Sequence, residues 1–325
     1  MIVFIIRRSL QSFIVVFFMS FLVFGGVNLV GDPVEMMVSD EADQEERERV
    51  IRSMGLDKPW YVQYGVFITN AVQGDMGKSF VYGEQALGII VQRMPATFEL
   101  ALAALLLAIV LGIPLGVFAG LKPDSRSSKV IMASSILGFS LPTFWVGLMF
   151  IMVFAVMLGW LPSTGRGETV DILGINLSFL TVDGLTHLLL PAVNLALFKI
   201  SLVIRLARAG TREVVHQDYI KFARAKGLST NRVIFVHLMK NIMIPVVTVL
   251  GLEFGGLIAF SVVTETVFAW PGMGKLIIDS IQNLDRPVIV AYLMIIVLVF
   301  VIINLIVDVM YSILDPRVRL QDVQA

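Results

Sequence analysis

The sequence predicts an all-α membrane protein with six transmembrane helices. Of its 325 residues, 57% are hydrophobic and only 15% are charged. A soluble domain of this size needs a larger polar surface, whereas a helical bundle that faces lipid does not. In addition, six separate stretches are largely apolar over the ~20 residues needed to cross ~30 Å of hydrocarbon. They are residues 9–30, 98–121, 130–160, 185–207, 241–264 and 287–312.

The first stretch has features of a signal peptide, because Arg7 and Arg8 precede an apolar run. The run is too long for the hydrophobic region of a signal peptide, and no small-x-small cleavage site follows it. We therefore expect a retained N-terminal anchor helix over residues 1–30.

The distribution of lysine and arginine predicts the orientation. With the N-terminus inside, 15 of the 25 basic residues lie in cytoplasmic segments, nine lie outside, and Lys199 lies within a span. Eight of the 15 are concentrated between residues 205 and 240, beside membrane ends, where the positive-inside rule applies. We expect both termini to face the cytoplasm.

Prolines and glycines inside the spans indicate a packed bundle. Spans two to five each contain a proline, which a bundle tolerates where neighbouring helices satisfy the freed carbonyls. These are Pro114, Pro142, Pro191 and Pro245. Gly112, Gly116 and Gly120 recur every four residues on one face of the second span, a spacing that permits close helix–helix approach.

The sequence contains no complete enzyme motif that we can identify. The stretch 74–79 ends like a phosphate loop, but Val72 stands where that loop needs glycine. The chain has no cysteine, its three histidines lack metal-ligand spacing, and its net charge of zero favours no nucleic-acid partner. We predict no catalytic residues, no metal site and no enzymatic activity.

Polar groups inside the spans are candidates for function because they are costly in lipid. Glu253 in span five and Asp308 in span six are the clearest, with Asn194 and Asn304 as polar companions. We hypothesise that Glu253, Asn194 and Asp308 line a translocation pathway. The alternative for Glu253 is a buried carboxylate that is protonated or paired with a neighbouring helix. For Asp308, which lies close to the cytoplasmic end of its span, the alternative is a purely structural role.

The loop 208–240 carries the strongest functional signal. In residues 213–228, apolar Tyr219 and Phe222 lie near basic Arg224 and Lys226, and Gly227 follows as a helix C-cap. One interpretation is a basic helix on anionic lipid. The other is a short cytoplasmic helix that docks into a partner protein.

At this point the chain resembles a known family over nearly its whole length: the oligopeptide/dipeptide-type permeases of ABC transporters. The matching stretches are Ala223–Ser229, Gly74–Ser79, Arg93–Thr97, Thr264–Gly274, and Asn304, Asp308, Tyr311 and Asp315–Arg317. Residues 223–229 resemble the peptide-type version of the importers' coupling motif. Two departures are Lys221, where the general motif has glutamate, and Glu253, where we expect glutamine.

The resemblance implies a type I ABC importer permease fold: an anchor, a 31–97 extracytoplasmic subdomain, a 98–312 core and a 313–325 cytoplasmic tail. It also implies a bacterial or archaeal inner membrane and a complex with a second homologous permease, two cytoplasmic ATPase subunits and a binding protein. ATP and Mg would be bound by the partners, with no cofactor in this chain. The implied ATPase-coupling residues are Tyr219, Phe222, Ala223, Arg224, Ala225, Lys226 and Gly227. The implied binding-protein contacts are Trp270, Pro271 and Gly272.

The implied substrates are di- or oligopeptides. Similar permeases handle nickel complexes, glutathione or glycosides, and selection rests mainly with the binding protein, so these remain alternatives. An ATP-independent channel or secondary transporter also explains the spans and Glu253, but leaves residues 213–228 without a role.

Overall fold

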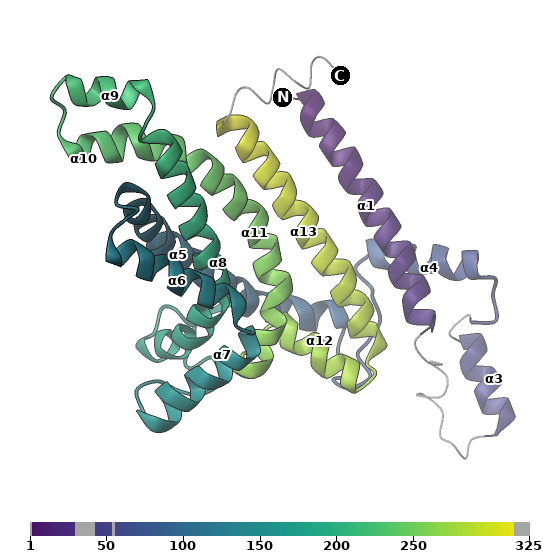
Figure 1. The fold of residues 1–325 in the computed structure, drawn as a ribbon. Coiled ribbons are helices and arrows are strands. Elements are labelled where there is room, and N and C mark those ends of the chain that lie inside the picture. Colours follow the sequence, from purple (N-terminus) through teal and green to yellow (C-terminus); the bar gives the residue numbers. More distant parts are fainter. Residues whose placement is uncertain (1, 30–42, 54–55, 315–325) are drawn as a thin grey trace. The chain divides into compact units, whose positions relative to one another are not determined.

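A computed structural model describes residues 2–29, 43–53 and 56–314 of the chain (Figure 1). Within them, five helices are long and apolar enough to cross a membrane, and six if one bent helix pair counts as a single span. This agrees with the six predicted spans. Residues 31–42, 54 and 55 of the predicted extracytoplasmic subdomain and the tail residues 315–325 lie outside the described part of the chain.

The structure is almost entirely helical. Its helices are α1 (Ile2–Leu29), α3 (Gln44–Ser53), α4 (Trp60–Val72), α5 (Ala86–Leu121), α6 (Arg126–Ser140), α7 (Thr143–Phe150), α8 (Val182–Val214), α9 (Asp218–Ala225), α10 (Thr230–Arg232), α11 (Met239–Val267), α12 (Met273–Gln282) and α13 (Arg286–Leu314). Two π-helical segments, η1 (Ile151–Met157) and η2 (Val233–Leu238), continue α7 and precede α11. The strands β1 (Val170–Ile172) and β2 (Ile175–Leu177) form one antiparallel hairpin.

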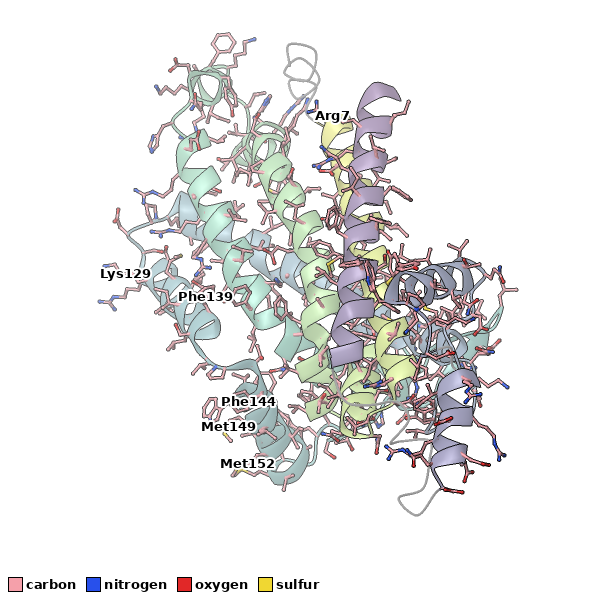
Figure 2. All side chains as sticks on the ribbon, turned by 90° about the vertical axis from the view of Figure 1, so that its right-hand side faces the viewer. Arg7, Lys129, Phe139, Phe144, Met149 and Met152 are labelled. Carbon is pink, nitrogen blue, oxygen red and sulfur yellow. The ribbon has the colours of Figure 1, made fainter. Side chains whose placement is uncertain are left out.

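The third predicted span, 130–160, is broken rather than straight. Helices α6 and α7 meet at an angle of 106° around Leu141 and Pro142. Proline has no N–H and forces the preceding residue out of the helical region, and Leu141 is accordingly extended, with φ −83° and ψ 136°. Figure 2 shows Phe144, Met149 and Met152 beyond this break. Pro114, Pro191 and Pro245, in contrast, lie inside continuous helices.

The chain divides into two compact units, each described here by itself. Residues 1–93 with 276–302 form the first unit. In it, Ser20 of α1 hydrogen-bonds the hydroxyl of Tyr64 of α4 over 2.8 Å, within a group of edge-on aromatic rings. Helix α3 is solvated, with ion pairs between residues four apart.

The phosphate-loop-like stretch 74–79 belongs to the first unit and makes a turn. Gly74 and Gly77 both have positive φ, and the backbone N–H of Gly77 donates to Asp75 over 3.0 Å. The Ser79 hydroxyl and the Phe80 N–H then donate to the carboxylate of Asp285. These contacts give the stretch a structural role within the first unit.

Residues 94–275 with 303–325 form the second unit, and the glycine face of α5 packs against α8 in it. A Cβ on Gly112 would lie 2.7 Å from Val203, and one on Gly120 would lie 2.5 Å from Thr211. A Cβ on Gly116 would lie 2.6 Å from the carbonyl oxygen of Ile204. The predicted close helix–helix approach is therefore confirmed.

The core of this unit lies between α5, α8, η2 and α11, and includes α9. Ile220 and Ala223 of α9 are buried against these helices. The hairpin precedes α8 and α9 follows it, so the two lie at opposite ends of α8 (Figure 1).

Candidate functional site

Helix α9 presents one apolar face to the core and another to the outside. Ile220 and Ala223 are buried, whereas 60% of Phe222 is exposed and Tyr219 is also exposed. The helix ends before Gly227, whose φ of +72° turns the chain, and which confirms the predicted C-cap. A helix with one buried and one exposed apolar face fits a contact with a second protein on its exposed face.

Neighbouring side chains support the exposed aromatics. The Lys226 ammonium lies 4.5 Å from the centroid of the Phe222 ring, a cation–π contact. The amide of Asn241 donates to the Tyr219 hydroxyl over 2.9 Å, and partial burial raises the pKa of Tyr219. The Lys221 ammonium hydrogen-bonds Asp218 and holds the pKa of that carboxyl below its usual value.

Two corrections apply to the predicted coupling residues. Ala223 is buried in the core, so its side chain holds α9 in place and does not reach the surface. The sequence interpretation also missed Phe235 of η2, of which 72% is exposed, and its exposed neighbour Val236. Arg224, Ala225, Lys226 and Gly227 are exposed as expected.

The predicted pathway residues occupy different environments. Asn194 is completely buried, and its amide donates to the Thr264 hydroxyl over 3.2 Å. Glu253 pairs with Lys199 of α8, and its side chain is partly exposed. Asp308 of α13 is half-buried. Direct lining of a pathway stays a prediction for Glu253 and Asp308, whereas burial argues against it for Asn194.

The segment after α11 is folded around Glu265. Its carboxylate accepts hydrogen bonds from the Thr97 hydroxyl at 2.7 Å, the Ser261 hydroxyl at 2.9 Å and the Lys275 N–H at 2.9 Å. Glycine is required at 274, because a Cβ there would lie 2.7 Å from the Cα of Val262. Glu265 therefore ties α5 and the start of α12 to the end of α11.

The predicted binding-protein contacts lie in this segment. Trp270 has no exposed area, and its indole N–H donates to the carbonyl of Ala96 over 2.8 Å. Gly272 is buried and Pro271 is half-buried. The correction is that Trp270 and Gly272 have packing roles here, because both are buried by their neighbours within this chain.

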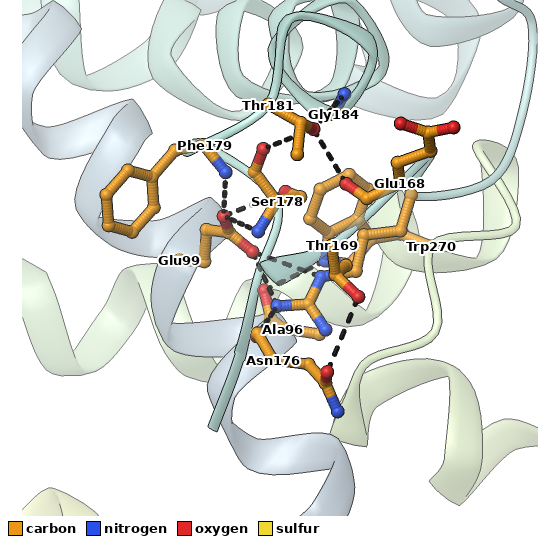
Figure 3. Close-up of polar contacts among 11 residues, drawn as sticks. Ala96, Glu99, Glu168, Thr169, Asn176, Ser178, Phe179, Thr181, Gly184 and Trp270 are labelled. Atoms are coloured by element: carbon orange, nitrogen blue, oxygen red, sulfur yellow. Dashed lines mark hydrogen bonds and ion pairs between the residues drawn. The ribbon is translucent and has the colours of Figure 1, made fainter. Parts of the chain in front are cut away.

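A second buried carboxylate, Glu99 of α5, fixes the loop before α8 (Figure 3). It accepts hydrogen bonds from the Ser178 N–H and hydroxyl, both at 2.8 Å, and from the Phe179 N–H at 2.7 Å. It also accepts two from the guanidinium of Arg166, which donates in turn to the carbonyl of Asn176 in the hairpin. The guanidinium lies 5.8 Å from the Trp270 ring, so the two carboxylate clusters are neighbours.

Comparison with known protein families shows which class of protein this chain is. Residues 112–320 match the family described as binding-protein-dependent transport system inner membrane component, and residues 1–101 match its N-terminal region. The chain belongs to this family. It is a multi-pass membrane permease, as the sequence predicted.

Curated relatives of the permease cover almost all of it. A di/tripeptide transport system permease protein of Pseudomonas aeruginosa is 39% identical over 97% of this chain and 98% of its own. An oligopeptide transport system permease protein of Bacillus subtilis is 41% identical over 97% of this chain and 99% of its own. A glutathione transport system permease protein of Escherichia coli K12 is 37% identical over 97% of this chain and 98% of its own.

Solved structures confirm the fold of the permease. An inward-facing structure of the MetNI methionine ABC transporter contains a chain that matches with a TM-score of 0.55. The match covers 70% of this permease and 96% of that chain, at 16% sequence identity. The predicted ABC importer permease fold is therefore confirmed.

Replacing Arg166 by leucine is expected to destabilise the permease by about 3–5 kcal/mol, because it leaves the buried Glu99 carboxylate without its cation. Thermal denaturation in detergent and proteolysis of the loop 158–180 measure the effect. Arg166→Lys is the control, since it keeps the charge and loses only the two-pronged contact. Equal denaturation temperatures for wild type and Arg166→Leu would contradict the assigned role.

Proposed function

We propose that this permease and a second homologous permease form the path by which di- or oligopeptides cross the inner membrane. An extracytoplasmic binding protein delivers the peptide, and two cytoplasmic ATPase subunits drive the cycle. The two-sided helix α9 is the observation that carries the proposal, because an ATP-independent channel or carrier has no use for it. The names of the relatives support peptides as the substrate class.

Helix α9 is suited to transmit motion. Its exposed Tyr219 and Phe222 would seat in a groove of the ATPase, while its buried Ile220 and Ala223 pack against α8 and α11 through the shared core. A displacement of α9 by the ATPase therefore moves the helices that it packs on as rigid bodies. Rocking of this kind alternates the opening between the two sides of the membrane.

This function fixes the orientation of the chain. The α9 end, with its eight basic residues between 205 and 240, faces the cytoplasm, as do both termini. The hairpin and the segment around Trp270 then face outward. Binding-protein contact falls to exposed residues of these loops, such as Ala269, with Pro271 at their edge.

ATP and Mg belong to the partners in this proposal. Within the described ranges, the chain has no group of three or more acidic, histidine or cysteine side chains that could hold a metal ion. In this proposal ATP hydrolysis takes place in the ATPase subunits, and the permease contributes the path and the coupling surface.

The first test is affinity purification of the tagged permease from its native membrane, followed by mass spectrometry. Recovery of a homologous permease and P-loop ATPases supports the proposal. Recovery of the chain alone, with uptake that survives ATP depletion, overturns it. Peptide bound to the companion binding protein supports peptide transport, whereas glutathione, a nickel complex or a glycoside on that protein would replace peptides as the substrate.

Replacing Phe222 by serine is expected to weaken ATPase binding at least tenfold and to abolish uptake. Buried aromatics at the centre of an interface are typical hot spots, and a loss of about 1.4 kcal/mol is tenfold in affinity. Co-purification of the ATPase measures the effect. Phe222→Leu keeps the apolar contact, and Phe80→Ser makes the same change at an exposed position of the first unit, so both should retain the ATPase. Full ATPase retention by Phe222→Ser would exclude α9 as the docking element.

A further inference from the structure

Lys199 and Glu253 form an ion pair between two membrane-spanning helices. Lys199 lies in α8 and Glu253 in α11, and the ammonium contacts the Glu253 carboxylate directly. The pair links positions that are 54 residues apart in the sequence. Both helices are long and apolar enough to cross a membrane, so this pair lies within the membrane-spanning part of the second unit.

The two charged side chains are not equally covered. The Lys199 side chain is 10% exposed and the Glu253 side chain is 33% exposed. A carboxylate with a third of its surface uncovered is costly against lipid, so intramembrane carboxylates face protein or water-filled cavities. In a complex of two permeases, the uncovered side of Glu253 is therefore expected to face the partner permease or a water-filled path rather than lipid.

A glycine and an aromatic ring lie next to the pair. Gly256 has no side chain, and a Cβ there would lie 3.8 Å from the Glu253 carboxylate and 3.9 Å from the Lys199 ammonium, so its bare backbone lies beside both charges. On the other side, the Lys199 ammonium lies 5.1 Å from the centroid of the Phe198 ring. This cation–π contact stabilises the ammonium when its carboxylate partner is displaced.

We propose that Lys199 and Glu253 form a subsite for zwitterionic peptides in the translocation path. Glu253, the more exposed member, binds the α-ammonium of the peptide, and Lys199 binds its α-carboxylate. Without peptide the two residues neutralise each other. With peptide they exchange one ion pair for two, so each side chain has a partner of opposite charge in both the free and the peptide-bound state.

This charge balance makes the subsite selective. A peptide with a blocked amino end leaves Glu253 without a cation, and a peptide with a blocked carboxyl end leaves Lys199 without an anion. An uncompensated charge away from water is strongly unfavourable, so each residue rejects one kind of blocked peptide. The inference rests on the proposed peptide transport and adds a site that reads both ends of the peptide.

The test is ATP-driven uptake into proteoliposomes containing the complete transporter and its binding protein. The probes are trialanine, N-acetyl-trialanine and trialanine amide, with each rate divided by the probe's occupancy of the binding protein. Glu253→Gln is expected to lower the preference for trialanine over N-acetyl-trialanine at least tenfold and to leave the preference over the amide unchanged. Lys199→Met is expected to do the reverse.

The double variant Lys199→Met/Glu253→Gln is the control for misfolding of the single variants, because it removes both charges and leaves neither unpaired. It is expected to transport trialanine and to lose both preferences. Wild-type preferences in the double variant, or equal losses for all three probes in each single variant, would show that the pair only holds α8 against α11. Absence of ATP-driven trialanine uptake by the wild type would instead overturn the proposed function.

Discussion

Replacing Gly116 by alanine is expected to disrupt the packing of α5 on α8 and to remove most folded permease from the membrane. The added Cβ would lie 2.6 Å from the carbonyl oxygen of Ile204, 2.7 Å from the Cβ of Ala207 and 3.1 Å from the Cα of Ile204. Two of these atoms belong to the backbone, so no change of side-chain rotamer relieves the contact. Overpacking of this kind costs about 1–3 kcal/mol, and a rigid backbone neighbour places it at the upper end.

Gly88 provides the matched control, because it lies on the same helix and no atom lies within 4 Å of its added Cβ. Alanine is the better helix former by about 1 kcal/mol, so Gly88→Ala is expected to be neutral or stabilising. Denaturation midpoints in detergent and the yield of membrane-inserted permease measure both variants. A shared sign for the two substitutions would contradict close packing at Gly116.

The glycine face shows what the sequence can predict. Spacing of four places Gly112, Gly116 and Gly120 on one side of a helix, and that regularity depends on local geometry alone. The partner helix could not be predicted, because nothing within α5 specifies α8. The prolines illustrate the same limit. Pro142 breaks a span and Pro191 does not, although both lie in apolar stretches.

The candidate site was predictable where it depends on a local pattern. Phe222 beside Lys226, followed by Gly227, predicted a short exposed helix with a glycine end, and the structure has it. Ala223 was misplaced because the inward face of α9 depends on the helices beneath it. Phe235 was missed because η2 is π-helical, which changes the periodicity that assigns faces.

The ion pairs lay beyond sequence reasoning altogether. Glu99 and Arg166 are 67 positions apart, and Lys199 and Glu253 are 54 apart. Intramembrane cost identified Glu253 as important but left open whether it paired with a neighbouring helix or lined a path. The structure supplies the partner and also shows a partly uncovered carboxylate, so pairing and access to the path are compatible properties of the same residue.

Replacing Glu265 by alanine is expected to unfold the corner where α5, α11 and α12 meet, and to abolish uptake. The change removes the acceptor of the Thr97 hydroxyl and of the Lys275 N–H at a buried site, whereas the Ser261 hydroxyl can still donate to the carbonyl of Ile258. Each unsatisfied buried donor costs about 1–3 kcal/mol, so two of them remove a substantial part of the stability of a typical domain. The carboxylate also lies at the N-terminus of α12, where a negative charge is favourable.

Glu265→Gln separates the charge from the shape of the side chain. Glutamine keeps one acceptor oxygen but places an amide donor against the donors that face Glu265, so we expect an effect close to that of alanine. Thr266→Ala is the control, because Thr266 is exposed and its hydroxyl bonds only the Val262 carbonyl of its own helix. Denaturation midpoint, protease resistance of residues 265–285 and peptide uptake are compared for the three variants. A wild-type midpoint for Glu265→Ala would mean that this segment is held by Trp270 packing alone. Loss of uptake with an unchanged midpoint would instead place Glu265 in the transport cycle itself.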